Sequence, residues 1–352
     1  MKRKLLLILA ITLAFALVLG ACAGGSAPAA EPSPAPAPEE PAGSTEPAGG
    51  SNYDIRLGVI QPGPEFYYQR YSDSVKAGAE AAGMTPIVML SEWDSNKEIS
   101  NVEDLISQGI DAIVAYSTSN ETAQRISQLS NEAGIPIFLT AFAAADGPGV
   151  PTSTIDNSFY DMGATCGTWL VDNFEGSAKI LEIQGLLGQG IAEGISTGFA
   201  DMIAERSDLE VVAQYEAKWD RSLATAITED ALASGLDFDM IFVHNEDMCS
   251  GVVNVLKGSD ALDRVNIITQ NGSDDGIAMI RAGEVLMTCA NPPSTIAGDT
   301  LVILMKYLDG KPFPEHYHSP VFMIDKSNVD DPDNPTWDVR FAVKAVEEYM
   351  RG

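Results

Sequence analysis

Short apolar runs rich in β-branched residues alternate with longer amphipathic segments along most of this chain, and that alternation restricts its fold. The run at 55–60 is typical of a buried strand. The segment at 96–108 places Ile99, Val102 and Leu105 on one helical face, and Gly109 follows as a stop signal. Such alternation predicts parallel sheets covered by helices on both faces, which is an α/β fold.

The alternation is interrupted once and then starts again. We expect strands at 55–60, 86–90, 112–115 and 135–139, and then at 179–183, 210–217, 240–244, 266–269 and 285–289. We expect helices at 72–82, 96–108 and 121–132, and then at 160–173, 191–206, 223–233, 248–256, 276–281 and 337–349. Because about 300 residues follow position 52, twice the usual size of one domain, we predict two doubly wound parallel-sheet lobes.

The first fifty residues are of a different kind. Lys2, Arg3 and Lys4 precede an apolar run at 5–19, and this pattern predicts a secretory signal peptide at 1–21. The sequence Leu-Gly-Ala before Cys22 resembles the bacterial lipobox, which implies a lipidated Cys22; an ordinary signal with an incidental cysteine is the alternative. The Pro/Ala/Gly-rich stretch at 22–52 lacks the apolar residues of a core, so we expect a disordered linker that tethers an extracytoplasmic body to the cell membrane.

Charge and cysteine content limit the partners of this chain. The formal net charge is −29, and loss of the three cations of the signal would bring it to −32. Nucleic acids and anionic lipids require clustered Lys and Arg, so we expect neither as a partner. Cys166, Cys249 and Cys289 lie far apart in apolar surroundings, which favours buried free thiols and leaves one bridged pair open.

Aromatic and amide side chains follow several expected strands. Ligands of open parallel sheets bind beyond the carboxyl ends of the strands, so these positions are candidates for a binding site. Aromatic rings cover the C–H faces of a sugar or polyol, and amides pair with hydroxyls; ordinary packing is the alternative for the rings. The positions concerned are Phe66, Tyr67, Tyr68, Trp219, Asn245, Asn271 and Asn291.

An ordered set of short motifs resembles the type 1 periplasmic binding proteins, in particular the ribose- and galactose-type binding proteins of ABC importers. The resemblance spans 55–324. It implies a hinge with three crossings, near Asp156, Asn291 and Val321, and thus an N-terminal lobe of 53–155 plus 292–321 and a C-terminal lobe of 156–291 plus 322–352. The motifs are Asp156-Asn157, Glu182-Ile183-Gln184-Gly185, Gly198-Phe199, Trp219-Asp220-Arg221, His244-Asn245-Glu246-Asp247-Met248 and Asn271-Gly272.

The resemblance also implies roles for individual residues. Residues 66–68 would form an aromatic wall, Trp219 would stack from the other lobe, Asn245 would bond sugar hydroxyls and Asn291 would face the ligand from the hinge. This chain departs from the family where Thr140-Ala141, with Phe142 beside it, replaces an Asp-Arg pair. It departs again where Ile195 replaces an Arg and Asn271 replaces an Asp.

These departures predict a neutral, more apolar pocket, because buried charges without partners are costly and both members of each pair are lost together. We therefore expect a deoxy sugar, polyol, glycoside or nucleoside rather than a common free aldopyranose. Glu193 could supply a new anchor; a solvated residue at a helix start is the alternative. The candidate ligand-binding residues are Phe66, Tyr67, Tyr68, Thr140, Phe142, Glu193, Trp219, Asn245, Asn271 and Asn291.

The resemblance implies a monomeric solute receptor that delivers a small neutral hydroxylated ligand to an ABC permease. A receptor that reports its ligand to a membrane sensor is the alternative. No nucleophile–base order or zinc spacing is present, so we expect no enzyme activity and no cofactor.

Three weaker signals point elsewhere. His316 and His318 alternate on one segment, so both could point one way, but two histidines without a third ligand do not predict a metal site. The acidic loop at 325–334 lacks the order of a calcium loop, and a solvated loop is favoured. The glycines at 185–190 lack the P-loop Lys and are better read as a site rim than as a phosphate-binding turn.

Overall fold

A computed structural model describes residues 53–188 and 190–352 of the protein. The expected signal peptide, the lipidated Cys22 and the linker at 22–52 lie outside these residues. Within the part of the chain that is described, no helix is long and apolar enough to cross a membrane.

The first lobe is built on a six-stranded, wholly parallel sheet in the order β11-β5-β4-β3-β1-β2. Two apolar clusters cover its two faces, one under α2 and α3 and the other under α1, α9 and α10. The strands are β1 (Arg56–Gln61), β2 (Thr85–Leu90), β3 (Ala112–Tyr116), β4 (Ile137–Thr140), β5 (Ser153–Asp156) and β11 (His316–His318). The helices are α1 (Phe66–Ala81), α2 (Ser95–Ser107), α3 (Asn120–Ala133), α9 (Pro293–Leu308) and α10 (Arg340–Arg351).

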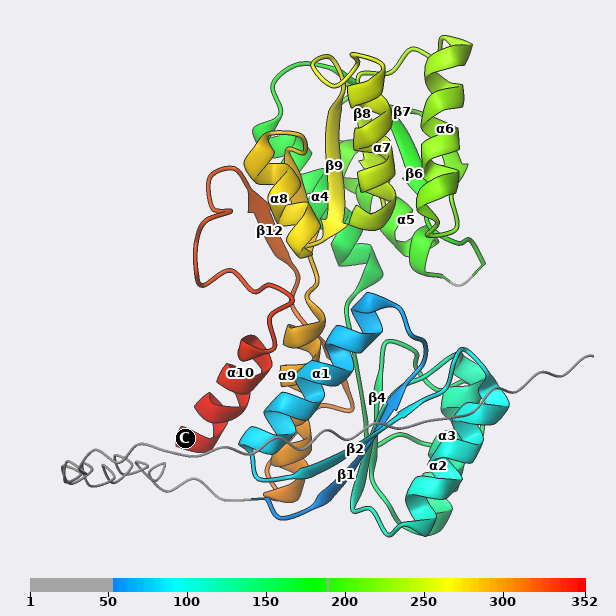
Figure 1. Cartoon of the computed structure of the whole chain (residues 1–352), viewed down its shortest axis with the longest axis vertical. Helices are drawn as coiled ribbons and strands as arrows, with labels where there is room; N and C mark the ends of the chain where they lie inside the picture. The colour runs from blue at the N-terminus through cyan, green and yellow to red at the C-terminus, as the bar shows by residue number, and fades with distance from the viewer. Residues whose placement is uncertain (1–52, 189) are drawn as a thin grey trace, which may run out of the picture. The chain divides into compact units, whose positions relative to one another are not determined.

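The second lobe repeats this plan with the order β12-β10-β9-β8-β6-β7, in which β12 alone runs antiparallel to its neighbour. Helices α4 and α5 cover one face, and α6, α7 and α8 cover the other (Figure 1). The strands are β6 (Ala178–Gln184), β7 (Leu209–Glu216), β8 (Met240–Val243), β9 (Asn266–Asn271), β10 (Met287–Ala290) and β12 (Phe322–Asp325). The helices are α4 (Phe159–Asn173), α5 (Ile191–Ile203), α6 (Arg221–Ser234), α7 (Glu246–Gly258) and α8 (Asp274–Ala282). The two-lobed α/β fold is confirmed.

Several helices begin with a polar cap directly after a strand. Ser119 accepts a hydrogen bond from the backbone of Thr122 at the start of α3, Asn245 caps α7, and Ser273 caps α8. Each cap satisfies a backbone N–H that the helix cannot satisfy itself. Because these helices follow β3, β8 and β9, the caps place polar side chains at the carboxyl edges of the sheets, where ligands of this fold class bind.

Glycines let α4 and α5 pack with their backbones in contact. A methyl group at Gly163 would lie 1.9 Å from the carbonyl oxygen of Ile195, and one at Gly198 would lie 2.0 Å from the carbonyl oxygen of Tyr160. Side chains at these positions would force the helices apart, so the Gly198-Phe199 motif has a packing role.

The chain passes between the two sheets more often than expected. It leaves the first sheet after β5, returns after β10 to form α9 and β11, and enters the second sheet again at β12. A fourth connection, 326–339, then leads to α10, which packs on α1 and α9.

The assignment of 322–352 to the C-terminal lobe is therefore wrong for α10. Its buried residues Ala342 and Val346 lie against Gly298 of α9 and Gly78 of α1, whose missing side chains make room for the helix. An amphipathic stripe specifies that a helix packs against apolar surface, and it does not specify which lobe supplies that surface.

Candidate functional site

Helix α1 begins six residues earlier than expected, so the three consecutive aromatic residues lie on its first turn instead of on a loop. Phe66 is half exposed and stacks on Trp337, with ring centres 5.7 Å apart, while the guanidinium of Arg70 lies 4.7 Å above the Phe66 ring. Tyr67 meets the same indole edge-on at 5.3 Å. Trp337 comes from the fourth connection and was not among the expected site residues.

The aromatic cluster continues into the first lobe. Tyr68 meets Trp93 and Tyr116 edge-on at 5.1 and 5.0 Å, and Tyr67 meets Tyr116 at 6.4 Å. Burial raises the pKa of Tyr67 and Tyr68 well above the ordinary tyrosine range, so both phenols are neutral at physiological pH. Edge-to-face contacts of this kind hold rings in fixed orientations, so this end of the lobe is a rigid, uncharged aromatic surface.

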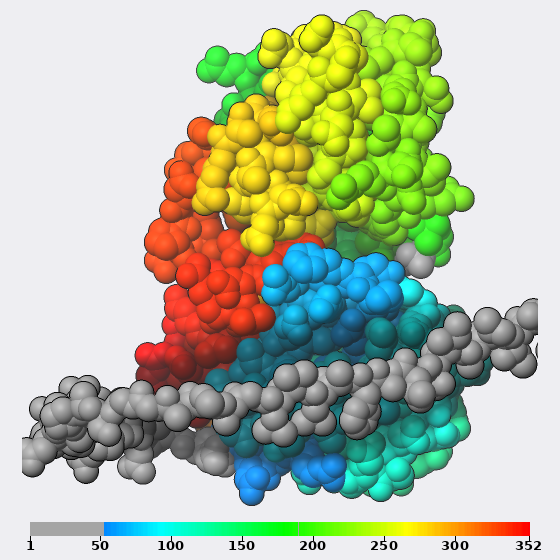
Figure 2. Space-filling view, in the orientation of Figure 1, coloured from blue at the N-terminus to red at the C-terminus, as the bar shows by residue number. Residues whose placement is uncertain are grey.

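Two hydrogen bonds connect this aromatic surface to the second sheet. The phenol of Tyr67 donates to the carbonyl oxygen of Asn291 at 3.4 Å, and the indole N–H of Trp337 donates to the carbonyl oxygen of Asn271 at 3.1 Å. The start of α1, in blue, and the C-terminal segment, in red, lie beside each other on the surface in Figure 2. Residues near both ends of the described chain thus bond the backbone of two of the expected asparagines.

In the second lobe, Trp219 follows β7 and lies flat against Gly185. A methyl group at Gly185 would lie 2.1 Å from the indole, so only glycine allows this approach. Lys218 and Trp219 both have left-handed backbone angles, with φ of 55° and 62°. Non-glycine residues adopt this conformation only where the surroundings impose it, so the indole is held by its backbone as well as by packing.

A buried polar network lies behind Trp219. The His244 ring lies 6.3 Å from the indole, and its Nε2 is 2.8 Å from Oε1 of Glu182. Glu182 also accepts hydrogen bonds from Ser196 and Gln214 at 2.5 and 2.6 Å. Burial would raise the pKa of Glu182, but the hydrogen bonds from His244, Ser196 and Gln214 outweigh it and hold that pKa below its usual value.

This network gives two of the resemblance motifs a physical role. Glu182 and His244 belong to two different motifs, and the sequence does not indicate that they pair because they lie 62 positions apart. We expect the network to hold in place the surface of the second lobe against which Trp219 packs.

The three asparagines come from neighbouring strands of the second sheet. Asn245 follows β8, and its Oδ1 accepts the backbone N–H of Met248 at 2.8 Å, which leaves its amide NH₂ group for another partner. Asn271 ends β9 with a φ of 121°, and its Nδ2 donates to Oδ1 of Asn291 at 3.2 Å. Because β8, β9 and β10 are adjacent, these amides form a row along the carboxyl edge.

A buried carboxylate supports that row from below. Glu246 accepts hydrogen bonds from the backbone of Gly272 and Ser273 at 2.8 and 2.6 Å and from the Thr288 hydroxyl at 2.6 Å. Burial raises its pKa to about 7. Glu246 therefore fixes the turn between β9 and α8, which carries Asn271.

Three of the expected site residues have local partners within their own lobe. Thr140 is fully buried, and its hydroxyl lies 2.6 Å from the Tyr71 hydroxyl. Phe142 packs against the apolar core of the first lobe. Glu193 accepts the backbone N–H of Gly188 at 2.5 Å, which lowers its pKa, although its Oε2 is buried without a hydrogen-bond partner. Ile195, at the position of the family arginine, is fully buried in the core beside α4.

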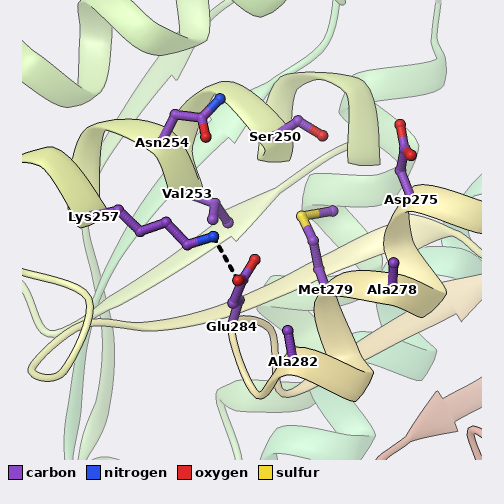
Figure 3. A pocket seen from close by; sticks show the side chains of 9 residues that line it. All are labelled: Ser250, Val253, Asn254, Lys257, Asp275, Ala278, Met279, Ala282 and Glu284. Carbon is purple, nitrogen blue, oxygen red and sulfur yellow. Dashed lines mark ion pairs between the residues drawn. The ribbon is translucent and has the colours of Figure 1, made fainter.

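A separate hollow of about 360 Å³ lies on the second lobe between α7 and α8. Figure 3 shows Lys257 pointing toward Glu284 across it, and the two form an ion pair at 2.5 Å. Its lining residues are Ser250, Val253, Asn254, Lys257, Asp275, Ala278, Met279, Ala282 and Glu284. None of them is among the expected ligand-binding residues, and the hollow contains no aromatic ring.

The fold and this arrangement define a two-lobed solute-binding protein, and sequence comparison agrees. The family profile described as a periplasmic binding protein domain matches residues 58–312, and the chain belongs to that family. The ribose import binding protein of Haemophilus influenzae is 27% identical over 245 residues, which cover 70% of this chain and 82% of that protein. The galactofuranose-binding protein of Escherichia coli is 25% identical over 273 residues, covering 74% and 84%.

Solved structures show the same fold. A Mycobacterium smegmatis protein in complex with β-D-fucofuranose matches with a TM-score of 0.71 and 24% identity, covering 83% of this chain and 98% of that one. An ABC transporter solute-binding protein of Bacillus halodurans with bound myo-inositol matches with a TM-score of 0.70 and 23% identity, covering 80% and 98%.

Proposed function

We propose that this protein binds a small neutral sugar or polyol and delivers it to an ABC permease. The observation that carries the proposal is the pairing of two fixed aromatic surfaces with a row of amides. Phe66 and Tyr67 lie on the first lobe, Trp219 lies on the second, and Asn245 begins the amide row. The curated relatives named above are sugar-binding proteins, and they support the same ligand class.

The proposed mechanism is closure of the two lobes on the ligand. A ligand shifts a conformational equilibrium only if it binds one state better than the other. Rings on the first lobe and Trp219 on the second would both contact the ligand in the closed state, and the amide of Asn245 would bond its hydroxyls. No covalent step is proposed, and catalysis has no role in this scheme.

The neutral chemistry of the site supports a ligand with few charged contacts. Thr140 and Ile195 occupy positions where the resembled family has charged residues, and both are fully buried. We therefore propose a deoxy sugar, a polyol or a glycoside ahead of free ribose or galactose. A nucleoside remains an alternative ligand, because an aromatic surface also stacks on a base.

Membership of the family implies an extracytoplasmic location. We further propose that Cys22 carries the lipid anchor and that residues 22–52 form the tether, on the sequence evidence given above. Transfer to a permease is favoured over signalling to a membrane sensor, because one named relative is a ribose import binding protein and another is an ABC transporter solute-binding protein.

The test is a thermal-shift screen of the mature chain against sugars, polyols and nucleosides, followed by calorimetric titration. A large shift from one neutral compound, lost in Trp219→Ala, is the expected result. Tight ribose or galactose binding would overturn the ligand class but not the receptor function. Absence of any shift across the panel would count against the receptor itself.

A further inference from the structure

The structure brings together three side chains that the local sequence does not connect. His316 and His318 lie on β11, and Asp156 ends β5; the strands are parallel, with His318 opposite Asp156. Because side chains alternate along a strand, both imidazoles point to the face on which the carboxylate lies. His316 Nε2 is 2.9 Å from Oδ2 of Asp156, and His318 Nδ1 is 2.5 Å from Oδ1.

We propose that Asp156, His316 and His318 form a binding site for a zinc-class divalent metal ion. One ligand atom from each residue lies within 4.8 Å of the other two. Two imidazole nitrogens and one carboxylate oxygen are a donor set that Zn²⁺ accepts, with water in a fourth position. Tetrahedral bonds of this kind place ligand atoms roughly 3.3 Å apart. The contacts of 2.9 and 2.5 Å to Asp156 would therefore lengthen by less than about 1 Å, and any separation near the 4.8 Å bound would shorten.

Exposure and charge both favour entry of a cation. The side chains of His316 and His318 are 49% and 55% exposed, so they are free to move, whereas that of Asp156 is 12% exposed. Asp156 is held by its backbone, because its carbonyl oxygen accepts the N–H of Ser319 at 2.7 Å. Within residues 53–188 and 190–352, the carboxylate of Asp156 forms its ion pairs with the two imidazoles and with no Lys or Arg.

A ring nitrogen that bonds a metal ion carries no proton, so an imidazole that donates to Asp156 in the metal-free triad would bind the ion as its other tautomer.

The site joins two of the connections between the lobes. Asp156 is the last residue of β5, after which the chain enters the second lobe, and His318 precedes the short segment that leads to β12. A bound ion would therefore fasten the edge strand β11 to β5 directly beside both connections.

The test is calorimetric titration of ZnCl₂ into the full mature chain, purified without a histidine tag and dialysed against EDTA. We expect one ion per chain with a dissociation constant in the micromolar range or tighter. At a hundredfold excess over that constant the melting temperature should rise by roughly 5 °C. Competition with Ni²⁺ and Cu²⁺ should follow, because imidazole sites bind Cu²⁺ more tightly than Zn²⁺.

Three variants and one control locate the site. Asp156→Asn, His316→Ala and His318→Ala should each weaken binding at least tenfold, and the two histidine variants alter exposed side chains that a stable fold does not require. Asp330→Asn makes the same change at an exposed carboxylate of the acidic loop and should bind like the wild type. No heat from the wild type, or equal binding in all four variants, would overturn the proposal.

Discussion

The contact between Gly185 and Trp219 allows the proposed ligand surface to be displaced without being removed. In Gly185→Ala the new methyl group would lie 2.1 Å from the indole, whereas an ordinary contact is 3.4–4 Å. The indole therefore has to shift by about 1.5 Å, as the difference between these distances requires. Gly185 does not have a left-handed backbone angle, so the substitution strains the ring contact and not the backbone.

The effect on ligand affinity follows from contact energies. An aromatic face contributes about 0.5–1.5 kcal/mol beyond its buried area, and roughly 40 Å² of apolar contact adds about 1 kcal/mol. Loss of the ring in Trp219→Ala should thus cost about 2 kcal/mol, or roughly thirtyfold in the dissociation constant. A gap of 0.5–1 Å already removes a quarter to a half of a dispersion contact, and the shift of about 1.5 Å exceeds that gap. Gly185→Ala should therefore lose between half and all of the 2 kcal/mol, which weakens binding roughly five- to thirtyfold.

The assay is calorimetric titration with the compound identified in the screen, using both single variants and the double variant. If Gly185→Ala acts through the ring, it should add nothing in the Trp219→Ala background. Gly258→Ala is the matched control, because a methyl group there meets open space; it should leave affinity unchanged. Wild-type affinity in Gly185→Ala, or an equal loss with and without the indole, would refute the assignment of Trp219 to the site.

Three further predictions concern stability and the fourth connection. Burial raises the pKa of Glu246 from 4.5 to about 7, so the folded state holds this proton more tightly than the unfolded state does. The protonated side chain stabilises the fold fully below pH 4.5, and about 3 kcal/mol of that stabilisation is lost as the pH rises to 7. Urea midpoints should therefore be higher at pH 5 than at pH 7.5, and Glu246→Gln should flatten that slope; an unchanged slope would contradict the assignment. Gly198→Ala should lower the unfolding free energy by about 1–2 kcal/mol, because overpacking outweighs the gain in helix propensity. Gly258→Ala should raise it, because its methyl group meets open space. If urea denaturation showed Gly198→Ala to be the more stable of the two variants, α4 and α5 would have to separate freely. Trp337→Phe keeps the ring on Phe66 but removes the N–H bonded to Asn271, so its melting temperature should fall by less than that of Trp337→Ala; equal losses would mean that the hydrogen bond, and not the ring, dominates.

The fold followed from local pattern because every strand–helix unit is encoded within a short window. Strand β3 is an unbroken apolar run, and all its residues are buried, as a central parallel strand requires. The sequence predicts too late a start for α1 because Pro64 and Glu65 are typical of a turn, and Glu65 provides no side-chain cap that would mark a helix start. The aromatic residues consequently extend the helix instead of forming a loop.

Site features that depend on distant residues could not be predicted in the same way. The triad of Asp156, His316 and His318 joins positions 160 and 162 apart, and only the pairing of β11 with β5 brings them together. The sequence predicts Trp337 at the start of a closing helix, and nothing in its neighbours indicates that Phe66 is its partner. The place of Thr140 at the end of a strand predicts a site residue, and local sequence does not reveal that its hydroxyl lies 2.6 Å from the Tyr71 hydroxyl inside the lobe.

The fourth connection changes what the proposed pocket consists of. Without it, the aromatic surface of the first lobe would consist of residues carried by α1, β3 and the β2–α2 turn. With it, Trp337 covers Phe66 and Tyr67 while its indole N–H is held by Asn271 of the second lobe. A ligand that stacks on Tyr67 must either displace this indole or bind beside it. The packing of α10 on Gly78 and Gly298 fixes one end of the connection, so the first lobe determines where Trp337 can lie. Ligand selection in this protein should therefore depend on its last thirty residues as well as on the strand ends that the family resemblance indicated.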